Sequence, residues 1–259
     1  MRQITLITGA SDGIGTELAR LMARDGHDLA LVARRGDRLE ALADEIAAQG
    51  RPRPLVLPCD LSSPAARDAL ESQLLAAHAQ VAWLVNNAGF GLHGPTARLD
   101  RALQLDMIDL NIHALTDLTL RFLPQISAAR GGLLHVASIA AFLPGPNMAV
   151  YYATKAYVLS FSEALAQEMK EKGVRVSVLC PGPTSTGFQK RAGLDAALFD
   201  AMHPMNARDV AQAGYAGLMA GQRVIVPGWM NKASRVLAGL TPHALLLPLV
   251  QRLQERRKA

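Results

Sequence analysis

The stretch TGASDGIG, residues 8–15, follows a short apolar run and leads into a segment with helical periodicity. Its glycines stand at positions 9, 13 and 15. Glycine lets a chain turn sharply out of a strand, approach a pyrophosphate without a Cβ in the way, and pack the next helix closely on the sheet. The position of this turn, between a first strand and a helix, predicts a phosphate-binding loop, and the alternative is a plain surface loop.

Further short apolar runs alternate with longer helix-period segments along the chain. The expected strands are residues 3–8, 28–33, 54–58, 83–87, 132–138, 174–179 and 223–227. The expected helices are residues 15–26, 37–50, 66–79, 103–127 and 157–173. This alternation predicts an α/β fold with a doubly wound parallel sheet of about seven strands and helices on both faces. The rhythm breaks at residues 184–206, where we expect a substrate loop, and again after residue 227.

Length and composition are those of one folded α/β domain spanning residues 1–259. Half of the residues are hydrophobic and 19% are charged, which excludes a disordered chain. The net charge of +5 is scattered along the sequence. We therefore expect ordinary solubility and an anionic small molecule as partner, and no nucleic-acid binding.

Cellular location is indicated by the cysteines and by the absence of targeting patterns. Cys59 and Cys180 each end an apolar run, which predicts buried free thiols and a reducing compartment. No secretory signal and no apolar run of ~18 residues is visible. A cytoplasmic protein is the expectation.

Several motifs beyond the glycine turn resemble those of the short-chain dehydrogenase/reductase family. The turn has the spacing T-G-x-x-x-G-x-G, and NNAG follows at residues 86–89. Asn111, Ser138, the pair Tyr151/Lys155 and PGPTST at residues 181–186 come in the family's order. The resemblance extends to about residue 227, and is to the subgroup of about 250 residues with T-G-x-x-x-G-x-G and Y-x-x-x-K motifs. It implies one Rossmann-like domain, an NAD(P)-dependent oxidoreductase, and a homodimer or homotetramer.

Two adjacent tyrosines precede a lysine in AVYYATKAYV, residues 149–158. Residues three and four apart are neighbours on a helix, so either Tyr151 or Tyr152 is able to face Lys155. The family motif Y-x-x-x-K implies that Tyr151 reacts and that Tyr152 packs or lines a pocket. A free tyrosine has a pKa of ~10, and an ammonium group with a cationic nicotinamide ring is expected to lower the pKa of Tyr151 toward neutrality. Tyr151 would then act as general acid or base on an alcohol or carbonyl.

Two more polar residues complete the expected catalytic group. Ser138 stands at the end of an expected strand, where its hydroxyl would hydrogen-bond the carbonyl oxygen of a substrate. The resemblance implies that Asn111 anchors a water molecule that links Lys155 to solvent; alternatively, Asn111 is a surface or satisfied core group. The seven histidines are scattered, so no metal site is expected.

The cofactor preference is read from the end of the second expected strand. A dinucleotide-binding fold that takes NAD usually has an acidic residue there, whereas this chain has Ala33, Arg34 and Arg35. Two guanidinium groups suit a 2′-phosphate, so we expect NADP(H) rather than NAD(H). Two acidic residues, Asp12 in the glycine turn and Asp37 just beyond the arginines, count against the preference for NADP(H). The alternative is that both arginines are simply solvated.

The resemblance implies a wider set of cofactor contacts. This set consists of Gly9, Ser11, Gly13, Ile14, Gly15, Arg34, Arg35, Asp60, Leu61, Asn87, Ala88, Gly89, Tyr151, Lys155, Pro181, Gly182, Thr184 and Thr186. Asp60 would contact the adenine, or else cap the next helix. Thr184 and Thr186 would meet the nicotinamide amide and the phosphates, or else serve as turn residues. Lys155 would also hold the nicotinamide ribose.

The C-terminal segment, residues 228–259, is expected to be a helical extension. It covers the substrate pocket or a subunit contact, lies on a membrane surface, or is disordered; leucines and a basic end are compatible with all three. Helix faces around residues 100–129 and 150–172 are the expected subunit contacts.

Three functions compete on these grounds. The first is an NADPH-dependent reductase, acting reversibly on a small carbonyl or alcohol substrate with an apolar portion. The second is an NAD-dependent alcohol or hydroxysteroid-type dehydrogenase. The third is a regulator that binds NADP without turnover.

Overall fold

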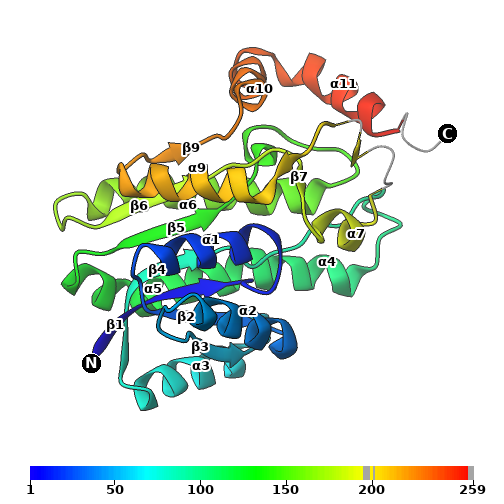
Figure 1. The fold of residues 1–259 in the computed structure, drawn as a ribbon. Helices are drawn as coiled ribbons and strands as arrows, with labels where there is room; N and C mark the ends of the chain where they lie inside the picture. The colour runs from blue at the N-terminus through cyan, green and yellow to red at the C-terminus, as the bar shows by residue number, and fades with distance from the viewer. Residues whose placement is uncertain (195–198, 201, 256–259) are drawn as a thin grey trace.

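A seven-stranded parallel sheet forms the centre of the computed structural model, which describes residues 1–194, 199–200 and 202–255 (Figure 1). Its strands are β1 (Arg2–Thr8), β2 (Leu29–Ala33), β3 (Leu55–Pro58), β4 (Ala79–Asn86), β5 (Gly132–Val136), β6 (Arg175–Leu179) and β9 (Val224–Ile225). The spatial order is β3-β2-β1-β4-β5-β6-β9. Every predicted strand is therefore present, and the doubly wound sheet is confirmed.

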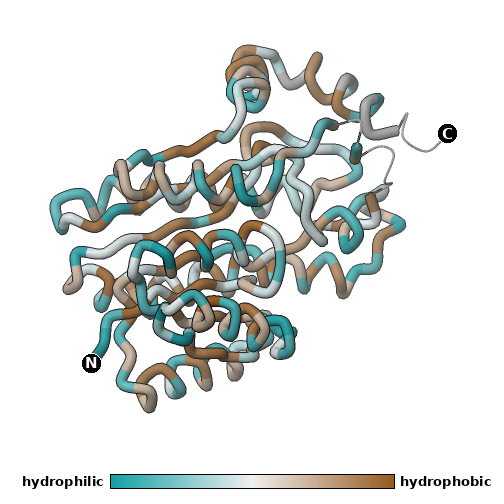
Figure 2. Tube along the Cα trace, in the orientation of Figure 1, coloured by the Kyte–Doolittle hydropathy of each residue, from teal (hydrophilic) through white to brown (hydrophobic). Residues whose placement is uncertain are grey.

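Helices cover both faces of the sheet and bury it. One face carries α1 (Gly13–Arg24), α2 (Gly36–Ala48) and α9 (Ala207–Met219). The other carries α3 (Pro64–Ala76), α5 (Leu115–Ala128) and α6 (Ala149–Met169). All five residues of β2 and of β5 are buried, which explains why these strands read as apolar runs without alternation (Figure 2).

The strand order reverses direction between β1 and β4. From β1 the chain crosses to β2 and β3 on one side, and later strands continue from β4 on the other. At such a switch point the loops at the carboxyl ends of neighbouring strands diverge and leave a crevice. The glycine turn follows β1, and the NNAG segment begins at the end of β4, so both motifs meet at this crevice.

The single helix predicted over residues 103–127 is interrupted in the structure. It consists of α4 (Arg101–Ile108), a π-helical segment (Asp109–Ala114) and α5. The π-helical turn carries Asn111, whose side chain is 1% exposed and bonded to neighbouring segments. A local π turn changes the direction of one side chain without ending the helix. The apolar periodicity of the sequence does not indicate such a turn.

A buried polar network joins β5 to the helices on the α5 and α6 face. His135 is fully buried, with its Nδ1 atom 2.8 Å from Ser162 Oγ and its Nε2 atom 3.1 Å from Thr119 Oγ1. Asn86 donates to the same threonine at 3.0 Å. Burial lowers the pKa of His135 to about 3, because a charged imidazole would lose its hydration there.

This histidine is expected to make the protein sensitive to mild acid. In the unfolded chain a histidine has a pKa of ~6.5, so between pH 6.5 and 3 the unfolded state binds the extra proton and stability falls as pH falls. Between pH 7.5 and pH 5, the stability advantage of the wild type over His135→Gln should shrink by about 2 kcal/mol. Urea unfolding at both pH values measures it. The exposed His113 gives the matched control His113→Gln, and parallel pH curves for wild type and His135→Gln would contradict the expectation.

The predicted substrate loop is closed at its two ends by a small parallel pair of strands. Thr184–Ser185 (β7) pairs with Met205–Asn206 (β8), and α7 (Phe188–Ala192) lies between them. Residues 195–198 and 201 of this loop lie outside the described residues.

The C-terminal extension forms two helices, α10 (Trp229–Leu240) and α11 (His243–Glu255), at one end of the molecule (Figure 1). α10 packs beside the 3-10 turn Ile139–Phe142, and the described part of the extension does not line the crevice. Residues 256–259, with most of the basic end, lie outside the described residues. The readings of this segment as a cover over the pocket, a subunit contact or a membrane contact stay predictions. Within the described ranges, no helix is long and apolar enough to span a bilayer.

Candidate active site

The glycine turn is held in shape by the loop that follows β4. Gly9 and Gly13 have φ values of +66° and +55°, a region that side chains with a Cβ rarely adopt. Asn87 donates from Nδ2 to the carbonyl oxygens of Thr8 and Gly9, at 3.0 and 3.2 Å. A Cβ at Gly15 would lie 2.5 Å from Asn87 Nδ2, so Gly15 provides close packing behind the turn.

A long cleft runs along the carboxyl ends of the strands and brings together nearly all the predicted cofactor residues. Its wall includes Gly9, Ser11, Gly13, Ile14, Arg34, Arg35, Asp60, Leu61, Asn87, Ala88, Gly89, Tyr151, Lys155, Pro181, Gly182, Thr184 and Thr186. Ser138 lines it too. Gly15 and Asn111 are not part of this wall and lie behind it.

At one end of the cleft, the two predicted arginines flank the end of β2. Ala33, Arg34 and Arg35 all line the wall there. Arg35 reaches Ser11 Oγ at 3.1 Å and Asp12 Oδ2 at 3.3 Å, which ties the end of β2 to the glycine turn. The alternative that both arginines are merely solvated is wrong for Arg35, because its guanidinium is bonded into this corner.

Asp60 lies at the same end, after β3. Hydrogen bonds from Ser62 hold the pKa of its carboxyl group below the ordinary value, and the Arg34 guanidinium adds to this effect. The cap of α3 is Ser63, whose side chain accepts from the Ala66 N–H, so the reading of Asp60 as that helix cap is wrong.

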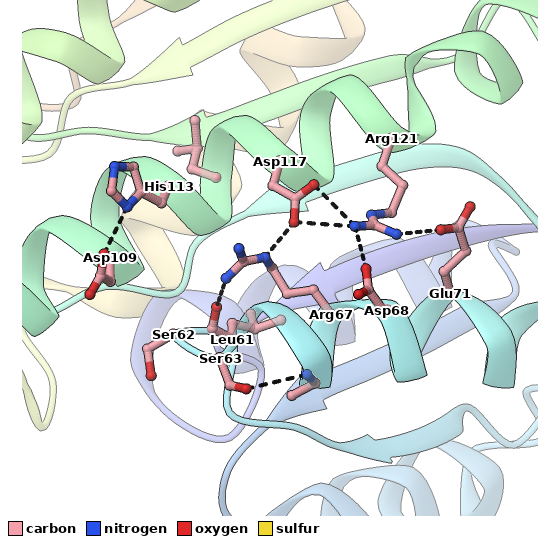
Figure 3. Close-up of polar contacts among 12 residues, drawn as sticks. Leu61, Ser62, Ser63, Arg67, Asp68, Glu71, Asp109, His113, Asp117 and Arg121 are labelled. Atoms are coloured by element: carbon pink, nitrogen blue, oxygen red, sulfur yellow. Dashed lines mark hydrogen bonds and ion pairs between the residues drawn. The ribbon is translucent and has the colours of Figure 1, made fainter.

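The loop with Asp60 and Leu61 is braced from behind by an ion-pair network (Figure 3). Arg67 on α3 is 6% exposed, donates to the Leu61 carbonyl oxygen at 2.7 Å and pairs with Asp117 on α5. Arg121 extends the network from α5 back to Glu71 on α3. The end of the cleft that holds Asp60 and Leu61 is thereby fixed to two helices.

At the other end, Ser138, Tyr151 and Lys155 converge. Ser138 follows β5, and its hydroxyl accepts from the Ala140 N–H at 3.1 Å, donates to the Pro181 carbonyl oxygen at 3.5 Å and lies close enough to Tyr151 to influence the pKa of that residue. Tyr151 and Lys155 lie on α6 and are 8% and 5% exposed. Lys155 Nζ is 5.8 Å from the centre of the Tyr151 ring and donates to the Val136 carbonyl oxygen at 2.9 Å.

Burial shifts the pKa values of both Tyr151 and Lys155. It raises the pKa of Tyr151 above the ordinary value of 10, and the nearby Ser138 hydroxyl opposes this rise only in part. Burial also lowers the pKa of Lys155 to about 8. These directions hold for the protein without a bound cofactor, so the expected lowering of the Tyr151 pKa by Lys155 together with a nicotinamide ring stays a prediction.

Asn111 lies beside this group and not within the cleft. Its Nδ2 donates to the Phe90 carbonyl oxygen at 2.9 Å and to Thr154 Oγ1 at 3.1 Å, and its Oδ1 accepts from the Phe90 N–H at 3.1 Å. A Cβ at Gly89 would stand 2.9 Å from Asn111 Oδ1 and 3.5 Å from Lys155 Nζ. The side chain is thus buried, hydrogen-bonded and close to the lysine, and its role as the anchor of a water molecule stays a prediction.

Tyr152 lines the cleft beside Tyr151 but is held differently. The two rings meet edge to face, with centres 6.1 Å apart. A Cβ at Gly145 would lie 2.5 Å from the Tyr152 ring, so this ring packs directly on the glycine backbone. It is part of the wall, as the Y-x-x-x-K motif implied.

The cleft has an apolar wall and one cation that belongs to no motif. The wall includes Ile139, Ala140, Met148, Phe188, Leu194, Phe199 and Met202, and Arg191 also lines the cleft. The apolar stretches within residues 187–206 suggested a hydrophobic wall, and the broken strand–helix rhythm located the loop. Neither signal showed which side chains face inward, and Arg191 was missed.

Three features together define the class of this protein: the switch point in strand order, the glycine turn and the tyrosine–lysine pair. This class is the nucleotide-binding oxidoreductases of α/β fold. The family model described as short chain dehydrogenase matches residues 3–197. The chain therefore belongs to the short-chain dehydrogenase family and is an NAD(P)-dependent oxidoreductase.

Relatives and solved structures cover most of the chain. Sulfoacetaldehyde reductase 2 of Chromohalobacter salexigens is 37% identical over 220 residues, 82% of this chain and 86% of that protein. A short-chain dehydrogenase from Sphingobium yanoikuyae in complex with NADPH is 32% identical, with a TM-score of 0.81 over 94% of this chain and 98% of that one. A 3-ketoacyl-(acyl-carrier-protein) reductase from Brucella melitensis, complexed with NADH, is 28% identical with a TM-score of 0.76, over 87% and 96%. Both nicotinamide cofactors thus occur among similar proteins.

Proposed function

We propose that this protein is an NADPH-dependent reductase of an uncharged, largely apolar ketone or aldehyde, reversible as an alcohol dehydrogenase. The observation that carries the proposal is the cleft itself. It joins a corner with two arginines, where Ala33 stands in place of a carboxylate, to Ser138 and the buried Tyr151 and Lys155 at the opposite end.

The residues present fit a nicotinamide dinucleotide with a 2′-phosphate. Arg34 and Arg35 would hold that phosphate, and the glycine turn at the start of α1 would face the pyrophosphate. Lys155 would hold the nicotinamide ribose. When bound, the cofactor supplies the hydride.

The side chains of the chain itself supply the proton and the orientation. The Ser138 hydroxyl is placed to hydrogen-bond the substrate carbonyl oxygen and so to hold it beside the Tyr151 hydroxyl. A raised pKa keeps Tyr151 protonated at neutral pH, so it acts as the general acid that donates its proton to the developing alkoxide. Lys155 is cationic below its pKa of about 8 and stabilises the phenolate left behind.

The substrate end favours an apolar molecule. Among the described residues, the cations that line the cleft are Lys155 and the three arginines Arg34, Arg35 and Arg191, and the arginines interact with one another at the other end. An anionic substrate such as a sulfonate would need a cation near its charge. We therefore propose a substrate different from that in the name of the Chromohalobacter relative.

Assembly and location complete the proposal. Exposed apolar side chains on α4, α5 and α6, namely Leu103, Leu105, Leu120 and Tyr157, support pairing of these helices in a homodimer or homotetramer. We propose that the assembly works in the cytoplasm, with free thiols at Cys59 and Cys180. A regulator without turnover is disfavoured because Tyr151, Ser138 and Lys155 are all assembled.

The cofactor preference is tested at the end of β2. Wild type is expected to use NADPH with a kcat/KM at least about 10-fold above that for NADH on a panel of apolar ketones and aldehydes, because charge-assisted bonds to a phosphate are each strong. Ala33→Asp should invert the preference, since the new carboxylate repels the 2′-phosphate and accepts from ribose hydroxyls. Ala33→Asn is the control of equal shape without the charge.

Three results would count against the proposal. A preference of the wild type for NADH would overturn the cofactor assignment. Equal effects of Ala33→Asp and Ala33→Asn would show that charge at this position does not decide it. Binding of NADPH without turnover of any carbonyl would favour the regulator.

A further inference from the structure

The substrate loop lies directly on the glycine turn. A Cβ at Gly13 would stand 2.5 Å from Thr186 Cγ2, and one at Gly187 would overlap the Asp12 carboxylate. One helical turn further, α7 carries Arg191, which lines the cleft. The helix of the substrate loop therefore also reaches the corner that holds Arg34 and Arg35.

Positive charge in this corner exceeds its counter-charge. Arg35 and Arg38 approach the Asp12 carboxylate at 3.3 and 3.9 Å, and Arg34 lines the same wall. Partial burial lowers the pKa of Arg191, the neighbouring guanidiniums of Arg34 and Arg35 lower it further, and the Asp12 carboxylate opposes this only in part. Four guanidiniums thus share the carboxylates of Asp12 and Asp60, so they repel one another, and an anion placed among them relieves this repulsion.

We propose that the Arg191 guanidinium binds the 2′-phosphate of NADPH together with those of Arg34 and Arg35. Through this contact the substrate loop would distinguish NADPH from NADH. The inference rests on the proposed NADP(H) preference and adds to it a residue from outside the dinucleotide-binding half. The phosphate would lie between cations of two segments, the end of β2 and α7.

The same helix also forms the wall next to the reacting tyrosine. Phe188 of α7 packs against Tyr151 with ring centres 5.4 Å apart, and the Ala192 carbonyl oxygen accepts from the His93 N–H at 2.9 Å. A contact between Arg191 and the phosphate would therefore fix the substrate wall as well. Binding of NADPH and of an apolar substrate should then favour each other, and by linkage the effect is reciprocal.

The decisive experiment measures cofactor binding without turnover. Dissociation constants of NADPH and NADH are obtained by fluorescence titration for wild type, Arg191→Gln and Lys190→Gln. Lys190 is the matched control, because it is an exposed neighbour on the same helix that does not line the cleft. We expect Arg191→Gln to weaken NADPH binding about 10-fold, to leave NADH binding within about twofold, and to reduce the salt dependence for NADPH. Lys190→Gln should change none of these.

The outcomes separate this inference from the proposed function. If wild type binds NADPH no better than NADH, the proposed cofactor preference fails. If wild type prefers NADPH and Arg191→Gln does not alter it, the preference stands and the role of Arg191 is refuted. Equal weakening of both cofactors would place Arg191 at the shared pyrophosphate and also refute it. Arg191→Lys, which keeps the charge, should fall between wild type and Arg191→Gln.

The substrate coupling gives a second readout. With wild type, the KM of an apolar ketone should be lower with NADPH than with NADH, and Arg191→Gln should remove the difference. A difference that persists in Arg191→Gln would contradict the coupling through α7.

Discussion

Tyr151→Phe is expected to lower kcat for carbonyl reduction by about 10³-fold, within the range of 10² to 10⁴ that a positioned general acid contributes. The substitution removes one oxygen atom from a ring that is 8% exposed and packed against Phe188, so the wall and the fold should stay unchanged. Without the hydroxyl, the alkoxide has no proton donor at the end of β5. Steady-state turnover with NADPH, beside a fluorescence titration of NADPH, measures the effect, and the dissociation constant should stay within about twofold.

The neighbouring tyrosine provides the matched control. Tyr152→Phe removes the same atom one position further along α6, from a ring that packs on Gly145, and should leave kcat within a few-fold of wild type. A large loss in Tyr152→Phe with little loss in Tyr151→Phe would reverse the assignment that the Y-x-x-x-K motif made. Loss of NADPH binding in Tyr151→Phe would mean that its hydroxyl serves the cofactor rather than the proton transfer.

The sheet was predictable from sequence because each strand is buried on both faces. Apolar runs such as residues 28–33 then stand out from the helical segments, and short connections leave few possible topologies. The π-helical turn at Asn111 was not predictable. It depends on bonds from that side chain to Phe90 and Thr154, which come from other parts of the chain.

The site was predictable as far as its residues belong to ordered motifs. Ser138, Tyr151 and Lys155 meet where strand ends and the start of α6 must meet in this topology. The pKa values of Tyr151 and Lys155 in the cofactor-free protein were not predictable, because burial depends on the whole cleft. Arg191 was missed because nothing in its local sequence shows that α7 folds back over the glycine turn.

The second large effect is expected for Lys155→Met, which should lose activity and gain stability. Lys155 is 5% exposed, and its one described hydrogen bond goes to the Val136 carbonyl oxygen. Methionine has a similar length and no charge, so it fits the same space. Turnover should fall by about 10²-fold or more, because neither the Tyr151 phenolate nor the nicotinamide ribose would keep its cationic partner.

The stability gain follows from the pKa of this lysine, which burial lowers from 10.5 to about 8. At pH 7 the Lys155 ammonium is charged in both the folded and the unfolded state, so its burial lowers the free energy of unfolding by about 3 kcal/mol. Lys155→Met avoids this cost but loses one hydrogen bond, so the variant should be about 1–3 kcal/mol more stable than wild type. Between pH 8 and 10.5 the unfolded state binds the extra proton, so this contribution makes wild-type stability rise with pH, whereas Lys155→Met lacks the rise. Urea unfolding of the cofactor-free protein at pH 7 and 9.5 measures both effects, with the exposed Lys172→Met as control. A variant less stable than wild type would show that Lys155 stabilises the fold, and its burial would then need no functional explanation.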